Sequence, residues 1–392
     1  GMSSLCAYLE MMKRESLQTD LLSISPELLA SMPGLHPATL AATASGGAWH
    51  CHPHLALLAS KLFDVAAGKC PRLLVMMPPR HGKSCMISQY FPAWFLGTFP
   101  DKRVLLASYE SDFAASWGRR ARDILEEYGR EFFGVSVRSA SSAANRWDLD
   151  GKAGGMVTAG ARAAVTGRGM DLGIIDDGVK DADEANSLTY RDRTWDWYLS
   201  TFSTRLHKNG AIVVVGTRWH EDDLIGRLLA SQATGGERWD VLNLPAIAEE
   251  DERIGSFSRR KGDALCPDLI PAEMLTAIEA RLGEYWWATL YQNRPFPRGG
   301  GVFRPEFLTV VDAPPLGMMR IRAWDLAASK DGKRTAGVLM GRNRDGEFCV
   351  LDVVMGRWLP GERDRVISRT AELDGHQVKI RIEQEPGSGG IA

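Results

Sequence analysis

A short apolar segment followed by Pro-Pro-Arg-His-Gly-Lys-Ser constrains the fold of this chain more than any other feature. Residues 73–77 predict a buried strand, the next two residues, both proline, end it, and Gly82 opens a helix. This order suits a phosphate site, because N–H groups at a helix N-terminus face the anion, Lys83 adds a compact positive charge and the Ser84 hydroxyl can ligate Mg²⁺. The general pattern G-x-x-x-x-G-K-[ST] fails at Met77. The segment alone therefore leaves nucleotide binding and chance occurrence about equally favoured.

Two further apolar segments end in residues that suit the same site. Residues 171–175 predict a strand that places Asp176 at its carboxyl end, where open α/β sheets bind ligands. Asp176 is expected beside Mg²⁺, and Asp177 is expected to orient or deprotonate the attacking water. A strand over 211–215 leads to Thr217, in a turn that can sense a γ-phosphate. The alternatives are acids that cap a turn and an ordinary strand end, but the upstream phosphate loop favours the metal interpretation.

The helix expected over residues 49–68 precedes the phosphate-loop strand and is placed to meet a nucleotide base. The candidates for adenine contacts are Trp49, His50 and His54. An aromatic residue with a purely structural role at a helix start is an equal alternative. The cluster of His50, Cys51, His52 and His54 is read as a polar loop rather than a metal site, since no second ligand cluster follows at zinc-finger spacing.

The composition is that of an ordinary globular chain. Its 392 residues suggest two or three domains, with 44% hydrophobic and 24% charged residues. The net charge of -2 excludes a uniformly basic nucleic-acid coat but permits a local basic groove. The six cysteines lack C-x-x-C spacing, which argues against a disulfide framework or zinc ribbon. No segment reads as a membrane span or signal peptide, so we expect no membrane association and a cytoplasmic location.

A stretch rich in Pro, Arg and Gly at residues 295–301 is the clearest linker in the chain. It divides a larger N-terminal part from a smaller C-terminal part. The expected organisation is a helical arm over 1–48, a P-loop ATPase domain over 49–238, a lid or adaptor segment with the linker over 239–301, and a ribonuclease-H-like domain over 302–392.

Beyond the linker, the expected order is three hairpin strands, a helix and a fourth strand. This order opens a ribonuclease-H-like fold, whose acids hold two Mg²⁺ or Mn²⁺ ions for phosphodiester cleavage. The first strand carries Asp325, expected as a buried carboxylate, and the fourth, over 378–385, places Glu383 and Glu385 on one face. Asp325 and one of these glutamates would converge on metal. Because the sequence stops at Ala392, the domain is expected to be truncated and its cleavage activity is doubtful.

Taken together, these motifs resemble the large terminase subunit of tailed double-stranded DNA bacteriophages or prophages. The most specific pieces are Pro78-Pro79-Arg80-His81-Gly82-Lys83-Ser84, Gly167-Arg168-Gly169 ahead of Ile174-Ile175-Asp176-Asp177, Gly216-Thr217-Arg218-Trp219-His220-Glu221-Asp222-Asp223-Leu224, and Leu290-Tyr291-Gln292-Asn293. The resemblance covers nearly everything from Trp49 to Ala392. It implies an α/β fold: a P-loop NTPase of the ASCE type, with a mostly parallel sheet flanked by helices, followed by the ribonuclease-H-like domain.

The same resemblance implies a function. The chain would be an ATP-driven motor that threads phage DNA through the portal into a procapsid, and an endonuclease that cuts concatemeric DNA. Its cofactors would be ATP and Mg²⁺ in the ATPase and Mg²⁺ or Mn²⁺ in the nuclease. Its partners would be double-stranded DNA, the portal protein of the procapsid and the small terminase subunit, in the cytoplasm of the bacterial host. A ring oligomer would form only on the portal.

The resemblance also assigns roles at the ATPase site. It implies that the nucleotide is bound by Pro79, Arg80, His81, Gly82, Lys83, Ser84 and Cys85. Ser84 and Asp176 match the Mg²⁺ ligands, and Arg80 matches an additional arginine that could follow the γ-phosphate. The catalytic base is usually Glu in such motors. Here that position holds Asp177, with Glu184 as a weaker substitute.

The remaining roles concern coupling, the arginine finger and the nuclease. Thr217 lies in the match to the coupling motif. A neighbouring subunit's arginine finger has two candidates in this sequence, Arg162 and Arg168. In the nuclease, Asp325 matches the first acid, and Glu385 is preferred over Glu383 as the second.

Two other functions compete with a packaging motor. One is a helicase-like or repair ATPase, although such enzymes do not require the acid-bearing strand at Asp325. The other is a truncated prophage remnant with an inactive nuclease, suggested by the end at Ala392.

Overall fold

The computed structural model describes residues 34–163, 169–296, 309–326 and 334–382. The chain forms two compact units, unit 1 (residues 1–299) and unit 2 (residues 300–392). Most of the expected N-terminal arm lies outside the described residues, as does the loop over 164–168.

Unit 1 contains a large sheet, a hairpin and helices. Its strands are β1 (Arg72–Met76), β2 (Arg103–Ser108), β3 (Val137–Ala143), β4 (Arg146–Leu149), β5 (Gly155–Gly160), β6 (Met170–Asp176), β7 (Leu206–Gly216), β8 (Asp240–Asn243), β9 (Glu252–Ile254) and β10 (Phe257–Arg259). Its helices are α3 (Pro37–Ala44), α4 (Pro53–Ala66), the π-helix η2 (Cys85–Tyr90), α5 (Phe91–Thr98), α6 (Ser111–Phe133), α7 (Ala182–Asn186), α8 (Leu188–Trp197), the π-helix η3 (Tyr198–Phe202), the 3-10 helix η4 (Ser203–Arg205), α9 (Leu224–Ala233), α10 (Ala272–Trp286) and the π-helix η5 (Trp287–Tyr291).

The large sheet has the strand order β3-β4-β5-β2-β6-β7-β1-β8. Neighbouring strands from β5 to β8 are parallel, whereas β3, β4 and β5 pair antiparallel. One strand, β7, separates the phosphate-loop strand β1 from the acid-bearing strand β6, which is the ASCE arrangement. The P-loop NTPase fold expected from the sequence is therefore confirmed. Because these strands are parallel, their carboxyl ends, which carry the candidate residues, meet at one edge.

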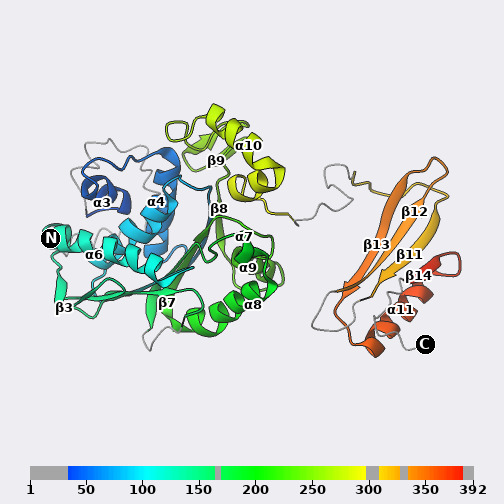
Figure 1. Cartoon of the computed structure of the whole chain (residues 1–392), viewed down its shortest axis with the longest axis horizontal. Coiled ribbons are helices and arrows are strands. Elements are labelled where there is room, and N and C mark those ends of the chain that lie inside the picture. The colour runs from blue at the N-terminus through cyan, green and yellow to red at the C-terminus, as the bar shows by residue number, and fades with distance from the viewer. Residues whose placement is uncertain (1–33, 164–168, 297–308, 327–333, 383–392) are drawn as a thin grey trace. The chain divides into compact units, whose positions relative to one another are not determined.

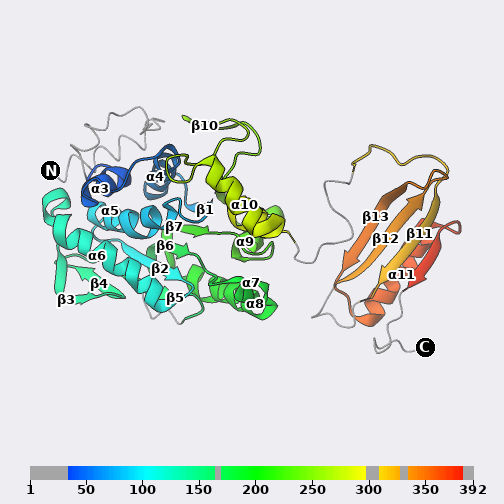
Figure 2. The same ribbon diagram turned by 45° about the horizontal axis from the view of Figure 1, so that its top comes forward.

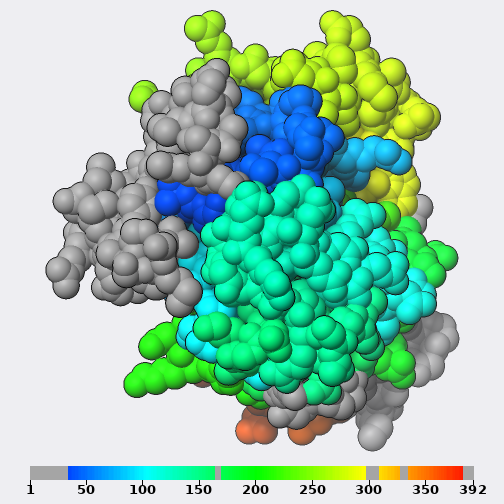
Figure 3. Space-filling view, turned by 90° about the vertical axis from the view of Figure 1, so that its left-hand side faces the viewer, coloured from blue at the N-terminus to red at the C-terminus, as the bar shows by residue number. Residues whose placement is uncertain are grey.

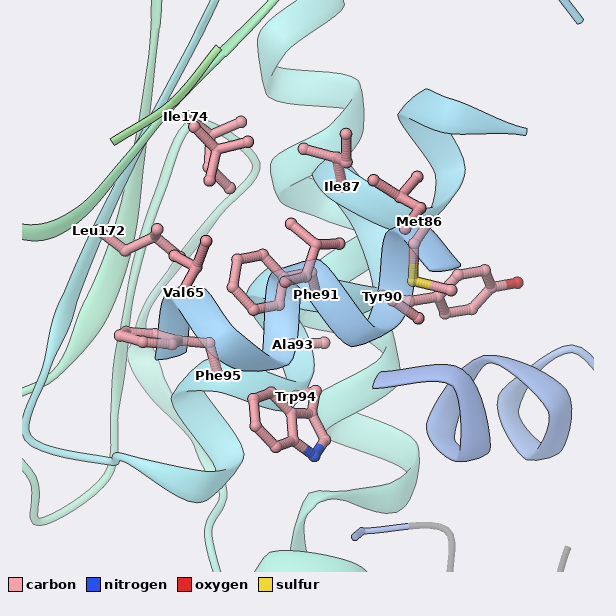
Figure 4. Close-up of a cluster of buried hydrophobic side chains, with 14 of the residues drawn as sticks. Val65, Met86, Ile87, Tyr90, Phe91, Ala93, Trp94, Phe95, Leu172 and Ile174 are labelled. Carbon is pink, nitrogen blue, oxygen red and sulfur yellow. The ribbon is translucent and has the colours of Figure 1, made fainter. Parts of the chain in front are cut away.

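The two faces of the sheet are covered by different helices (Figure 1). Alternate residues of β1 enter opposite cores: Leu73 and Val75 pack with α3 to α6, whereas Leu74 and Met76 pack with α8, η3 and α9. In the first core, Phe91 of α5 points toward Leu172 and Ile174 of β6 (Figure 4). Figure 3 shows the outside of this layer, where α6 and the β3–β4 hairpin (teal) lie beside α3 and α4 (blue). The sheet is thus buried on both faces.

A third, smaller core lies after β8. It joins Ala246 and Ala264, on either side of the β9–β10 hairpin, to α10 and η5. Figure 2 shows α10 in yellow beside α4. Gln292, just after η5, holds this segment to the chain after β8: its side-chain oxygen accepts from the Ile247 N–H at 3.0 Å, and its amide donates to the Ile247 carbonyl at 3.0 Å. Gln292, from the Leu290-Tyr291-Gln292-Asn293 motif, therefore fixes the end of η5 to the segment at Ile247.

Unit 2 is a four-stranded sheet with one described helix. Its elements are β11 (Met319–Asp325), β12 (Thr335–Arg342), β13 (Phe348–Gly356), α11 (Pro360–Asp374) and β14 (Lys379–Ile382). The strand order is β13-β12-β11-β14, with β11 antiparallel to β12 and parallel to β14. The sequence predicted this order of hairpin strands, helix and fourth strand.

Several elements differ from the expectation. The edge strand β8 lies beyond residue 238, where the ATPase domain was expected to end, and it pairs with β1. The chain between β6 and β7 forms four short helices, α7, α8, η3 and η4. Within the described residues, no helix has the length and apolar character needed to cross a membrane.

Candidate functional site

The phosphate loop leaves β1 and turns through two residues with positive φ, Arg80 (61°) and Gly82 (84°). A Cβ atom at Gly82 would come within 3.1 Å of the Leu55 side chain. Glycine is therefore favoured there both by the backbone angle and by the close approach to α4. The loop rests on the first turn of that helix.

Two buried histidines hold the loop from behind. His81 Nδ1 donates to the Pro79 carbonyl at 2.9 Å, and His54 Nε2 donates to the His81 carbonyl at 2.9 Å. Burial lowers the pKa of His54 to about 4 and also lowers the pKa of His81, so both rings act as neutral donors. His54 has no exposed surface. The structure thus places this residue, expected at the adenine base, underneath the loop.

The end of β6 brings Asp176 to the phosphate loop. Leu172 and Ile174 face the first core, and the pleat turns Asp176 the same way, toward η2. One carboxylate oxygen accepts from Ser84 Oγ at 3.0 Å, and the other accepts from Ser88 Oγ at 2.7 Å. Asp176 is completely buried. Ser84 therefore contacts the acid at the end of β6.

The next acid faces the turn after β7. Asp177 has a positive φ of 46°, and its Oδ1 accepts from the Thr217 N–H at 2.9 Å. Lys83 Nζ donates to Thr217 Oγ1 at 3.1 Å and lies 3.9 Å from Asp177 Oδ2. The segments after β1, β6 and β7 thus converge on one charged centre.

The electrostatics of this centre suit a divalent cation. Burial, and then the neighbouring Asp177, raise the pKa of Asp176 to about 7, although the Ser88, Lys83 and Ser84 side chains act to lower it. A cation between Ser84 and Asp176 would offset the cost of the buried charge. Hydroxyl and carboxylate oxygens suit Mg²⁺, which takes few protein ligands and adds water and phosphate oxygens. Among the described residues, no three His, Cys, Asp or Glu side chains group to hold a metal.

The candidate arginines occupy different environments. Arg80 is exposed at the start of the loop. Arg162 lies over the Tyr190 ring, 3.7 Å from its centroid, donates to the Tyr190 hydroxyl at 2.6 Å and lies 3.9 Å from Glu184. Glu184 itself accepts from that hydroxyl, so Arg162 and Glu184 share one cluster. Arg168 lies outside the described residues. Cys85 is partly buried at the start of η2.

Sequence reasoning missed two residues that fix this site. Ser88 is buried and holds Asp176; its only signal was its position four residues after Ser84. Asp223 was quoted in a motif without a role, yet it accepts from Arg218 Nε at 2.8 Å. Asp223 also caps α9, since its Oδ1 accepts from the Gly226 N–H at 2.8 Å. Arg218 is therefore anchored by a buried ion pair next to Thr217.

In unit 2, the expected buried carboxylate is exposed. Asp325 ends β11 on the sheet face opposite to Trp324, which is 2% exposed. The buried charge belongs instead to Arg322, whose guanidinium donates to both Asp374 oxygens at 2.7 and 2.8 Å and lies 2.8 Å from Asp352. The other acids expected at this centre, Glu383 and Glu385, lie outside the described residues.

Comparison with known proteins identifies the relatives of this chain. Residues 74–293, more than half of the chain, match the family described as terminase large subunit, T4likevirus-type, N-terminal. The large terminase of bacteriophage HK97 aligns with a TM-score of 0.43 and 13% identity over 86% of this chain and 70% of that one. A mutant ATPase domain of a Thermus phage large terminase aligns with a TM-score of 0.44 and 13% identity, over 67% of this chain and 100% of that one. A large terminase from a thermophilic bacteriophage, in complex with ADP, aligns with a TM-score of 0.38 and 10% identity, over 82% of this chain and 76% of that one. A search of curated proteins found no match.

Proposed function

Since the chain belongs to the T4likevirus-type terminase large-subunit family, we propose that it is the ATP-hydrolysing motor that packages double-stranded DNA into a phage procapsid. The observation that carries this proposal is the convergence of Lys83, Ser84, Asp176 and Thr217 at one edge of the sheet. A motor needs this arrangement, because phosphoryl transfer depends on positioning and on stabilising the developing charge.

The proposed division of labour follows the contacts at the site. Lys83 binds the terminal phosphates, and Ser84 and Asp176 hold Mg²⁺. When bound, Mg²⁺ would neutralise charge on the phosphate oxygens. Asp177 orients the attacking water, while the Thr217 N–H donates to Oδ1 of the Asp177 carboxylate and holds it in place. Because Lys83 also contacts the Thr217 hydroxyl, a γ-phosphate that drew Lys83 away would alter this turn.

The Arg80 side chain is proposed to follow the γ-phosphate from the exposed end of the loop. Arg162 and Arg168 are the candidates for action on a neighbouring subunit's nucleotide. For Arg162, this role requires release from Tyr190 and Glu184. Such release would be coupled to assembly of the ring on the portal. The other proposed partners are the small terminase subunit and DNA, and the proposed location is the cytoplasm of the bacterial host.

A DNA-stimulated ATPase assay tests the motor proposal. Lys83→Ala should lower the hydrolysis rate by about two orders of magnitude or more, as expected for loss of a charge that stabilises the transition state. Lys102→Ala is the matched control, since Lys102 is a half-exposed lysine that pairs with Asp171 away from the loop. Equal rates for wild type and Lys83→Ala would refute the assignment.

For unit 2, we propose a metal-dependent endonuclease that cuts concatemeric DNA. The support is the parallel pairing of β11 with β14, in which Trp324 lies opposite Ile382, so the strand that leads to Glu383 and Glu385 runs beside the strand that ends in Asp325. Asp325 and Glu385, with Glu383 as the alternative, would hold Mg²⁺ or Mn²⁺. We expect the wild-type protein to cleave supercoiled plasmid in Mn²⁺ and Asp325→Ala to abolish this cleavage. Intact plasmid with the wild-type protein would contradict the proposal.

A further inference from the structure

The Asp176 carboxylate accepts hydrogen bonds from two hydroxyl groups of one helical segment. Ser84 Oγ donates to Oδ1 at 3.0 Å and Ser88 Oγ donates to Oδ2 at 2.7 Å. Ser84 directly precedes η2 and Ser88 lies within it, four residues later, so both face the end of β6. The carboxylate therefore has no rotational freedom without breaking at least one of these bonds.

The two serines cannot have the same task. Ser84 is partly exposed at the phosphate loop, where its oxygen can reach a cation. Ser88 is 0% exposed and lies one turn deeper, behind the carboxylate. Its short bond to a carboxylate oxygen is of the strong, charge-assisted kind. Ser88 can therefore orient Asp176 but cannot itself touch nucleotide.

We infer that Ser88 is a positioning residue that fixes the Asp176 carboxylate for Mg²⁺ in the nucleotide site. This inference rests on the proposed ATPase function. Groups that hold a metal ligand in place commonly contribute tenfold or more to metal affinity, because an unrestrained carboxylate loses part of its binding energy in becoming ordered. Ser88 should thus act only on the metal-dependent part of nucleotide binding.

The chain offers a matched control in Ser108. This serine ends β2 directly opposite Asp176 in the β2–β6 pairing and is also 0% exposed. Within the described residues its hydroxyl has no hydrogen-bond partner. Ser108→Ala therefore removes a buried hydroxyl from the same neighbourhood without removing a bond to Asp176.

Binding of a fluorescent ADP analogue, titrated with Mg²⁺ and repeated in EDTA, separates the possibilities. Ser88→Ala should raise the half-saturating Mg²⁺ concentration by about tenfold or more, with affinity in EDTA within about twofold of wild type. Ser88→Thr, which keeps the hydroxyl, should restore the wild-type Mg²⁺ dependence, and Ser108→Ala should not change it. If the alanine variant fails to fold, as judged by its thermal melting curve, Ser88→Cys carries the same test because a thiol is a weak donor.

Each contrary result has a distinct meaning. An unchanged Mg²⁺ dependence in Ser88→Ala, or an equal loss of affinity with and without metal, would overturn the positioning role. An equal shift in Ser108→Ala would also overturn it, by showing a general packing effect. If wild type shows no Mg²⁺-dependent nucleotide binding at all, the proposed ATPase site fails, and this inference fails with it.

Discussion

Removing the Asp223 carboxylate tests how the segment after β7 is anchored beside the phosphate loop. The side chains of Arg218 and Asp223 are each 8% exposed, and their ion pair measures 2.8 Å. The Arg218 guanidinium also lies 3.5 Å from the sulfur of Met76, the last residue of β1. In Asp223→Ala, this guanidinium would remain buried without its counter-charge, and α9 would lose its cap.

The structure sets the size of the effect. Removing one partner of a buried ion pair typically costs about 3–5 kcal/mol, and loss of a helix cap costs about 1 kcal/mol. We expect Asp223→Ala to lower the free energy of unfolding by about 3–5 kcal/mol, since the two losses share one side chain and do not add fully. Arg218→Met combined with Asp223→Ala should cost less than Asp223→Ala alone, because the buried charge is then gone.

Urea unfolding followed by far-UV circular dichroism measures these changes. The control is Asp123→Ala, which breaks the exposed pair between Asp123 and Arg122 and should cost less than about 1 kcal/mol. An Asp223→Ala variant within 1 kcal/mol of this control would refute the reasoning. A double variant less stable than the single variant would show that the unpaired guanidinium is not the source of the cost.

Three further predictions concern other buried polar groups. Gln292→Leu should destabilise unit 1 by about 2–5 kcal/mol in urea unfolding, because the N–H and the carbonyl of Ile247 both lose their partners. A loss below about 1 kcal/mol would contradict the stabilising role of these two hydrogen bonds. Burial lowers the pKa of His36 to about 3 and that of His54 to about 4, so the unfolded chain binds more protons and unfolding free energy should fall as pH drops from about 6.5 to 4. His54→Gln should make that decline shallower, and a flat profile would argue against buried neutral rings. Arg322→Met should cost unit 2 about 3–5 kcal/mol in the same unfolding assay, since it leaves a buried aspartate unpaired, and unchanged stability would exclude this role.

The sequence predicted the central strands because burial on both faces leaves continuous apolar segments. Residues 73–77 and 211–215 are of this kind, and each feeds both cores. The edge strands could not be found this way. β3 and β8 have mostly exposed or half-buried side chains, and their strand state depends on backbone pairing. The partner of β3 is the adjacent strand β4, whereas β8 pairs with β1, which is distant in the sequence.

The candidate site was partly predictable for a related reason. Strand ends in a parallel sheet converge, so Lys83, Asp176 and Thr217 could be grouped before any coordinates. The placement of His54 could not be foreseen, because the side of a helix that faces a loop depends on packing. Ser88 escaped notice because it belongs to no motif and its role arises from the geometry of η2.

In strand β11, one choice of which side chain is buried explains why the predicted burial of Asp325 was wrong. Adjacent strand residues face opposite sides, so either Trp324 or Asp325 can enter the covered side of the sheet, but not both. Burying the large indole gains more than burying a carboxylate, which would need a partner to offset its desolvation. The pleat then also places Arg322 on the covered side, where Asp374 at the end of α11 neutralises it. Asp325 is left exposed at the strand end, where a carboxylate is accessible to a cation and to a phosphodiester. The exposed position of Asp325 departs from the expected burial and leaves its carboxylate available for the role proposed above.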